Sequence, residues 1–359
     1  MNEQEIVFTN DICQALEDFT NRIQHDKLFI LFDASTIRLC MPIIVPFLNK
    51  YEESHSKQVH QIVIEPTDQA KNITSLTEVW NSLSSNGATR HSLLINVGGG
   101  MVTDLGGFAA ATFKRGIKFI NVATTLLGAV DAAVGGKTGI NLGNLKNEVG
   151  AFAPADAVLI STSFFETLDH DNLLSGYAEM LKHGILSDKQ HLSDLLAYDI
   201  QHWDKDTLLP LLEYSVNVKR QVVRKDPYEK GLRKALNLGH TFGHAFETWC
   251  MKKDSPVLHG YAVAWGLVCE LIMSQQQVGF PSGILYEIAN FVKENYGPLH
   301  ITCDDYSNLI ELMKHDKKNE GDEINFTLMS QIGTPSLNHS ANQEQISIVL
   351  DIYRDLMGI

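Results

Sequence analysis

The stretch Ile95-Asn96-Val97-Gly98-Gly99-Gly100-Met101-Val102-Thr103-Asp104 decides the fold of the first half of this chain. An apolar run leads into three glycines, and a helical pattern over 105–112 follows at once. A buried strand, a glycine turn and a helix in this order are typical of open α/β sheets. Glycine lets the backbone approach an anion closely, and the start of the next helix offers unpaired N–H groups to it.

Short apolar runs of the same kind recur through the first half of the chain and predict buried strands of a largely parallel sheet. They cover 27–32, 61–64, 92–97, 118–122 and 157–160. After about residue 170, apolar residues recur at spacings of three and four, which predicts helices. The clearest helical stretches are 208–223, 258–276 and 284–295. The sequence therefore predicts an α/β half followed by a mostly α half.

The composition excludes several classes of protein. A chain of 359 residues is long enough for two domains. Its net charge of −14 opposes binding to nucleic acid or to an anionic membrane, although a local group of cations still suits a small anion. No apolar run reaches the ~18–20 residues that span a bilayer, and the acidic first residues lack the features of a secretory signal. We therefore expect a cytoplasmic protein.

The cysteines point the same way. There are five, an odd number, and no two form a C-x-x-C pair. This pattern favours reduced thiols over a disulfide framework or a thiolate zinc site.

The glycine turn admits two interpretations. A dinucleotide site is one, but the G-x-G-x-x-G fingerprint is not met, because Thr103 stands where its third glycine belongs. The next strand ends at Thr124-Thr125 without the usual ribose-binding acid, while Asp33 ends an earlier strand and can take that part. We expect a Rossmann-like domain without the standard fingerprint. A tight connection that binds nothing is the alternative.

A second glycine-rich segment, 131–141, contains Gly136-Lys137-Thr138 but lacks the earlier glycine of a phosphate loop. This argues against a nucleoside triphosphate. Lys137, Lys146-Asn147 and Arg115 near glycine turns still suit a phosphate group, and solvated surface charge is the other interpretation.

Histidines and acids in the second half suggest a metal. His240 and His244 are one helical turn apart, Glu179 shares a helix face with Lys182, and His259 directly precedes a helix. A catalytic zinc takes three protein ligands and keeps one position open. H-x-x-x-H alone is a weak motif, so a packed histidine pair stays open beside a metal site.

The motifs together resemble the 3-dehydroquinate synthase family in order and spacing, from about Asp33 to Gly333. They are 98–104, 124–127, 131–139, 146–147, 176–182, 231–233, 236–244, 258–260 and 316–319. The resemblance implies an α/β NAD-binding domain over 1–165, a helical metal- and substrate-binding domain over 166–359, an active site in the cleft between them, and a homodimer.

The resemblance also implies the site residues. The metal ligands are Glu179, His240 and His259, so that only one of the paired histidines binds the ion, which is zinc or, as an alternative, Co²⁺. The NAD contacts are Asp33, Asp68, Lys71, Gly99, Gly100, Asp104, Thr124, Thr125, Lys137, Lys146, Phe164 and Thr167. The substrate contacts are Asp131, Lys137, Asn147, Lys182, Lys219, Arg233, Asn237, His244 and Lys317, with Arg115 supplied by the partner subunit.

The implied reaction converts 3-deoxy-D-arabino-heptulosonate 7-phosphate to 3-dehydroquinate and phosphate in the shikimate pathway. It runs through transient oxidation by NAD, phosphate elimination, re-reduction and an intramolecular aldol closure. Two alternatives share the fold. One is another sugar phosphate cyclase, such as a 2-epi-5-epi-valiolone or 2-deoxy-scyllo-inosose synthase. The other is a glycerol-dehydrogenase-like oxidoreductase. Lys219 and Arg233, suited to a substrate carboxylate, argue against the first. A regulatory protein that kept the fold is disfavoured, because every ligand type is present.

Several positions depart from the family pattern. Tyr261 stands where Glu is usual after His-Gly, and Ala123 stands where Pro is usual. Asp68 replaces a Glu, whose side chain is one methylene longer. Asp169 and Pro227 are further departures. None of these five is an expected metal ligand, and Asp68 keeps the carboxylate that the resemblance assigns to NAD binding.

Overall fold

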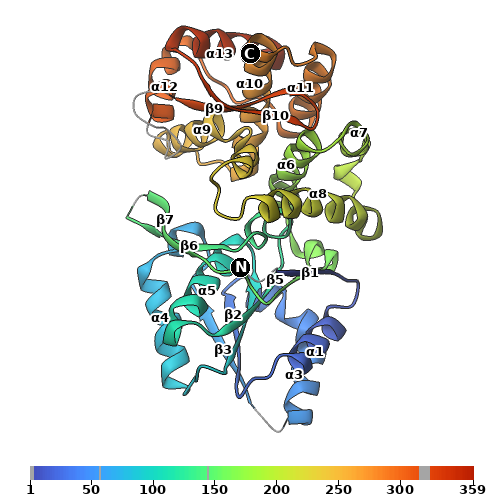
Figure 1. Ribbon diagram of the computed structural model, residues 1–359, viewed down its shortest axis with the longest axis vertical. Helices are drawn as coiled ribbons and strands as arrows, with labels where there is room; N and C mark the ends of the chain where they lie inside the picture. Colours follow the sequence, from blue (N-terminus) through green and yellow to red (C-terminus); the bar gives the residue numbers. More distant parts are fainter. Residues whose placement is uncertain (1–3, 56–57, 144, 315–323) are drawn as a thin grey trace. The chain divides into compact units, whose positions relative to one another are not determined.

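The computed structural model describes residues 4–55, 58–143, 145–314 and 324–359. The chain forms two compact units (Figure 1). The first unit comprises Met1–Asp169 and Asp204–Val216, and the second comprises His170–Trp203 and Asn217–Ile359. The chain thus returns briefly to the first unit before it completes the second.

A six-stranded sheet, parallel throughout, forms the centre of the first unit. Its strand order is β1-β8-β5-β4-β2-β3. The strands are β1 (Glu5–Phe8), β2 (Leu28–Asp33), β3 (Val59–Ile64), β4 (Leu93–Gly98), β5 (Lys118–Ala123) and β8 (Ala157–Ile160). The five predicted strands are confirmed, and every residue of β2 and β4 is buried, as in sheets covered on both faces. The short, half-exposed β1 lies outside the prediction.

Helices cover both faces of this sheet. They are α1 (Ile12–Arg22), α2 (Thr36–Leu39), α3 (Met41–His55), α4 (Ile73–Ser85) and α5 (Gly100–Thr112). The helices α4 and α5 lie on one side and α1 and α3 on the other (Figure 1). Leu76 and Val79 of α4 and Leu105 of α5 are fully buried in one apolar cluster with Phe29 and Leu31 of β2. This arrangement confirms the doubly wound, Rossmann-like prediction.

Helix α5 packs closely on β4 although the third glycine of the dinucleotide-binding fingerprint is absent. That glycine normally allows a helix to pack closely on its strand. Here the buried Thr103 bonds back within the helix to Gly99 O, and the close approach occurs three residues later at Gly106. A Cβ on Gly106 would lie 2.1 Å from Oδ1 of Asn96 on β4.

A two-stranded antiparallel hairpin lies over α5. It consists of β6 (Lys137–Leu142) and β7 (Leu145–Phe152), so residues 137–141 of the second glycine-rich segment form a strand and not a phosphate loop. A Cβ on Gly107 of α5 would lie 2.6 Å from Cγ2 of Thr138, which shows how closely the hairpin approaches the helix.

The second unit is mostly helical, as predicted. Its helices are α6 (His170–Leu186), α7 (Lys189–Ala197), the end of α8 (Lys205–Lys225), α9 (His240–Lys252), α10 (His259–Val278), α11 (Ser282–Tyr296), α12 (Tyr306–Lys314) and α13 (Gln343–Met357). A hairpin of β9 (Asn325–Gln331) and β10 (Thr334–Ser340), which the sequence did not indicate, packs on α10. No described helix has the length and apolar character needed to cross a membrane.

The central helix α10 packs against α6 and α9 at two glycines. A Cβ on Gly260 would lie 1.9 Å from Ser175 O on α6. A Cβ on Gly266 would lie 2.0 Å from Gly239 O and 2.8 Å from Gly243 N, at the start of α9. Since these neighbours are backbone atoms, no side-chain rotation relieves the contact.

We therefore predict that Gly266→Ala lowers the free energy of unfolding by about 3 kcal/mol or more, at the upper end for overpacking. Gly283→Ala is the matched control, because nothing lies within 4 Å of a Cβ at this position in α11. The Gly283→Ala substitution should raise the free energy of unfolding by about 0.5–1 kcal/mol, because alanine favours a helix more than glycine does. Urea unfolding measures both variants, and equal stability of the two would contradict the packing described.

Candidate metal centre and cofactor site

Three side chains from three helices converge in the second unit. Glu179 lies within α6, while His240 and His259 are the first residues of α9 and α10. One ligand atom from each lies within 4.8 Å of the others. Oε1 of Glu179 is 3.5 Å from Nε2 of His240 and 3.7 Å from Nε2 of His259. A fully buried carboxylate facing two imidazole nitrogens fits a divalent cation such as zinc, with room for one more ligand.

Both imidazoles are held by their other nitrogen. Nδ1 of His240 lies 3.1 Å from Leu238 O, and Nδ1 of His259 lies 3.4 Å from Oε2 of Glu247. When Nδ1 donates its proton to such a partner, Nε2 keeps its lone pair. In both rings this nitrogen faces Glu179, so the rings are set for a cation on the Oε1 side.

Charges surround the buried carboxylate. Lys182, one turn along α6 and equally buried, forms an ion pair with Oε2 of Glu179. Burial alone raises the pKa of Glu179, but Lys182 and the two histidines outweigh it and hold this pKa well below the usual value. Burial lowers the pKa of His259, but Glu179 and Glu247 raise it to about 10. Without a bound metal ion, the His259 ring is therefore protonated on both nitrogens and positively charged at neutral pH.

The backbone around His240 is fixed by a second buried acid. Oε2 of Glu270, on α10, accepts the N–H of Gly239 at 2.7 Å, and its Oε1 accepts the N–H of Thr241 at 2.9 Å. The first N–H groups of a helix have no partner within it, and a carboxylate also suits the positive end of the helix dipole. Glu270 thus caps α9 from the neighbouring helix and determines where His240 lies.

His244 lies beside this cluster but is not part of it. Its ring centre is 5.3 Å from that of His240 and 6.0 Å from that of His259. Of the H-x-x-x-H pair, the structure places His240 in the three-residue group.

The approach of α10 to α6 fixes the position of His259. Gly260 has no Cβ to meet Ser175, and its N–H donates to Oγ of Ser175 at 3.0 Å. Tyr261, the departure from the family pattern, donates its O–H to Oδ1 of Asp171 at 2.9 Å. It therefore ties the start of α10 to the start of α6, which carries Glu179.

Further expected substrate residues of the second unit lie on α8 and in the 3₁₀ segment 232–237. Lys219 on α8 and Arg233 are almost fully buried, and Arg233 donates from Nη1 to Pro227 O at 2.7 Å. Nδ2 of Asn237 donates to Oε1 of Glu229 at 3.1 Å. Lys317 lies outside the described residues.

In the first unit, two glycine-containing turns meet at the carboxyl ends of β4 and β5. Thr124 N donates to Gly98 O, and the N–H of Gly128 donates to Oγ1 of Thr125. A Cβ on Gly100 would lie 2.9 Å from that of Ala132. The carboxyl edge of a parallel sheet is where open α/β folds bind ligands, and glycine here leaves the helix start accessible.

Other expected cofactor residues gather at the same edge. Oδ1 of Asp33 accepts the N–H groups of Ser35 and Thr36, both at 2.8 Å. Phe164 is fully buried and accepts a bond from Thr167 through its carbonyl. Burial raises the pKa of the Cys40 thiol to about 11, although bonds to Thr124 and Thr167 oppose it. Cys40, which no sequence motif singled out, is a neutral thiol that interacts with two expected NAD contacts.

A polar network joins the hairpin to this edge. Nζ of the buried Lys71 lies 2.5 Å from Oδ2 of Asp104 and 2.5 Å from Oδ1 of Asn147. An exposed ion pair of 3.3 Å links Lys146 to Asp68.

Two more expected site residues of the first unit lie in the glycine-rich segment 131–141. Asp131 is in the short helical segment Gly128–Ala132, and Lys137 is exposed at the start of β6.

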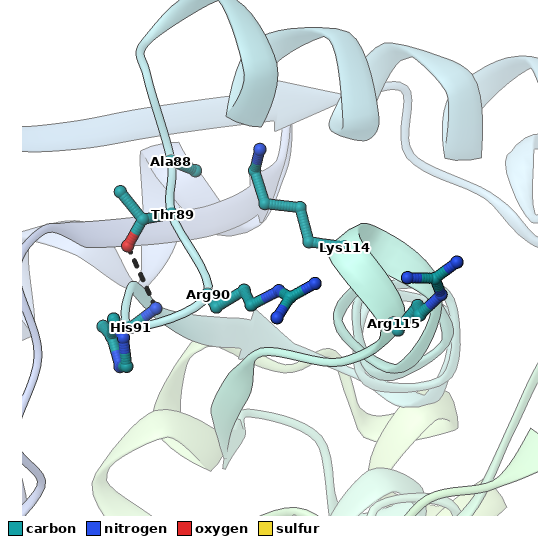
Figure 2. Close-up of a pocket in the computed structure, with 6 residues that line it drawn as sticks. All are labelled: Ala88, Thr89, Arg90, His91, Lys114 and Arg115. Atoms are coloured by element: carbon teal, nitrogen blue, oxygen red, sulfur yellow. Dashed lines mark hydrogen bonds between the residues drawn. The ribbon is translucent and has the colours of Figure 1, made fainter.

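Arg115 lies at the opposite end of the sheet. It lies three residues before β5, beside Lys114, and both residues have left-handed backbone angles (φ of 70° and 50°). Together with Arg90 and His91 these residues line a pocket of about 520 Å³ at the amino ends of the strands (Figure 2). Arg115 is therefore remote from the glycine turns of its own unit.

Comparison with known proteins agrees with this geometry. Residues 61–175 match the 3-dehydroquinate synthase N-terminal family, and residues 176–319 match the 3-dehydroquinate synthase C-terminal family. A 3-dehydroquinate synthase from Parabacteroides distasonis is 48% identical over the whole of both chains. The chain belongs to the 3-dehydroquinate synthase family.

Solved structures support the fold of this family. A 2-epi-5-epi-valiolone synthase from Streptomyces hygroscopicus, with NAD⁺ and Zn²⁺ bound, has a TM-score of 0.85 at 23% identity and covers 99% of this chain and 98% of its own. A 2-deoxy-scyllo-inosose synthase with carbaglucose-6-phosphate, NAD⁺ and Co²⁺ also has a TM-score of 0.85, at 21% identity, with 98% and 96% covered.

The cluster predicts different effects for its neighbouring histidines. His259→Ala should lower zinc affinity by more than the ~10–100-fold typical of losing an outer partner, since it removes a donor atom. His244→Ala should keep the zinc while turnover falls. Zinc content after dialysis and steady-state rates measure this, with the exposed His202→Ala as control. Equal zinc loss in the two variants would show that the wrong histidine was chosen.

Zinc uptake should also release a proton. A pKa of about 10 means that the metal-free His259 ring is protonated at pH 8, and a cation must displace this proton. Apparent zinc affinity should therefore rise about tenfold per pH unit between about pH 6.5 and 8. Calorimetric titration in buffers of different ionisation enthalpy counts the released protons, and heats that do not depend on the buffer would contradict this.

Proposed function

We propose that this chain converts 3-deoxy-D-arabino-heptulosonate 7-phosphate to 3-dehydroquinate and phosphate, the second step of the shikimate pathway to aromatic amino acids. The observation that carries the proposal is the full-length identity of 48% to a 3-dehydroquinate synthase, combined with the buried group of Glu179, His240 and His259. Members of this family use NAD and a divalent metal, and the donor set here suits both zinc and Co²⁺.

Glu179, His240 and His259 would hold the cation. When bound, the cation would polarise a substrate hydroxyl, and NAD would exchange hydride reversibly with the carbon that bears this hydroxyl. Lys182 keeps Glu179 ionised, because its ammonium group is paired with Oε2 in a site with no solvent exposure. The nearby His244 offers an imidazole to the substrate phosphate.

The remaining residues bind and orient the substrate and the cofactor. An anionic sugar phosphate needs several charge-assisted contacts, each worth about 1.5–3 kcal/mol. We assign this part to Asp131, Lys137, Asn147, Lys182, Lys219, Arg233, Asn237, His244 and Lys317. We assign the binding of NAD to Asp33, Asp68, Lys71, Gly99, Gly100, Asp104, Thr124, Thr125, Lys137, Lys146, Phe164 and Thr167.

Lys219 and Arg233 support a substrate with a carboxylate. Both side chains are less than 10% exposed, and a buried cation suits a ligand that brings an anion. A sugar phosphate cyclase whose substrate lacks a carboxylate, or a dehydrogenase acting on glycerol, would give these cations no substrate carboxylate to bind. The family match likewise favours neither alternative.

We extend the proposal to the domain boundaries, the oligomeric state and the cellular location of the protein. Residues 1–165 would be the NAD-binding domain and 166–359 the metal- and substrate-binding domain. The protein would be a homodimer in which Arg115 serves the partner subunit, since it lies at the end of the sheet away from the glycine turns. A cytoplasmic location is supported by the cysteines, all five of which are free thiols.

The test is the reaction itself. With the heptulosonate phosphate, catalytic NAD⁺ and Zn²⁺ or Co²⁺, we expect phosphate and dehydroquinate in equal amounts and no net NADH. Glu179→Gln should lose nearly all activity, whereas Glu294→Gln, exposed on α11, should keep it. Absence of phosphate release, or NADH accumulating with each turnover, would rule the proposal out.

A further inference from the structure

Glu247 is a buried acid close to the metal centre that has no place in the ligand or substrate sets above. It lies on α9, seven residues after His240, and is 8% exposed. A carboxylate this deeply buried is costly unless it meets a cation or a proton donor. Its Oε2 lies 3.4 Å from Nδ1 of His259, at the first residue of α10.

The register between α9 and α10 brings these two residues together. Gly239, directly before α9, and Gly243 and Glu247 within it are spaced by four and form one row on the side of α10. A Cβ on Gly239 would lie 2.8 Å from Leu267, and a Cβ on Gly243 would lie 3.1 Å from Ala262 O. The two helices therefore run antiparallel in close contact. The two glycines permit this approach, and the third member of the row meets His259.

The two imidazoles of the cluster differ in what holds them. His240 has a neutral backbone carbonyl, Leu238 O, at its Nδ1, whereas His259 has a carboxylate. Nε2 of His259 faces Oε1 of Glu179 at 3.7 Å, so its ring lies between two acids from different helices. A carboxylate at Nδ1 fixes the orientation of a metal-binding imidazole and makes Nε2 a better donor.

We propose that Glu247 is a positioning residue for the metal centre. Its carboxylate accepts the Nδ1 proton of His259 and so directs the lone pair of Nε2 at the cation that Glu179 and His240 share. This role rests on the proposed function, because it requires His259 to be a metal ligand.

The test is zinc affinity of the metal-free protein, measured by competition with a chromophoric chelator. Losing an outer carboxylate typically costs about 10–100-fold in metal affinity, and we expect this for Glu247→Ala. Glu247→Gln should fall between Ala and the wild type, because an amide oxygen still accepts the Nδ1 proton but carries no charge. Glu287→Ala, at an exposed position of α11, is the matched control and should bind zinc like the wild type.

Two further readouts separate positioning from a general structural role. The absorption bands of the Co²⁺-loaded protein should shift in both Glu247 variants, because they report the geometry of the ligands. Thermal unfolding of the metal-free Glu247→Gln protein should match that of the wild type. A lower melting temperature with unchanged zinc affinity and unchanged Co²⁺ bands would overturn the proposal in favour of a structural role.

The His259→Ala variant distinguishes failure of this inference from failure of the proposed site. If His259→Ala loses zinc while Glu247→Ala binds it as tightly as the wild type, the role of Glu247 is wrong and the ligand set stands. If His259→Ala itself binds zinc like the wild type, the ligand set is wrong, and the role of Glu247 falls with it.

Discussion

The carboxylate of Glu179 has no solvent exposure, and the second unit is arranged around the need to balance its charge. Removing a charge from water costs several kcal/mol, which only close counter-charges and hydrogen bonds offset. Lys182 pairs with one oxygen, and two imidazole nitrogens face the other. A cation bound by the acid and both imidazoles would complete this balance, which is why the group suits metal chemistry better than a structural ion pair.

Close helix packing makes that convergence possible. His240 and His259 begin their helices, so small shifts of α9 or α10 would separate them from Glu179. Gly260 and Gly266 allow α10 to touch the backbone of α6 and α9, where any side chain would force the helices apart. Glu270 then caps α9 from α10, so the position of His240 depends on the same packing. The metal centre is thus as rigid as the core that holds it.

In the first unit, the close contact between α5 and β4 lies at a different position from that in the standard dinucleotide-binding fingerprint. Gly98–Gly100 leave the helix start accessible at the carboxyl edge of the sheet, but the close contact of helix and strand occurs at Gly106 and not at Thr103. The fingerprint is therefore absent while its physical requirements are met. Lys71, held between Asp104 and Asn147, connects this edge to the β6–β7 hairpin, which also carries Lys146.

The sequence by itself determined five of the six strands of the sheet, the main helices and the family, because periodicity and ordered motifs can be recognised without coordinates. It did not indicate β1, which pairs with the distant β8. It also missed the β6–β7 and β9–β10 hairpins, because β7 and β10 bury few residues and so lack the apolar run of a core strand. Nor did it single out Glu247 and Glu270, since helical spacing identifies neighbours within one helix only. Tertiary structure alone decided that these acids meet His259 and the start of α9, because glycine-to-backbone contacts between helices set the register that brings them together.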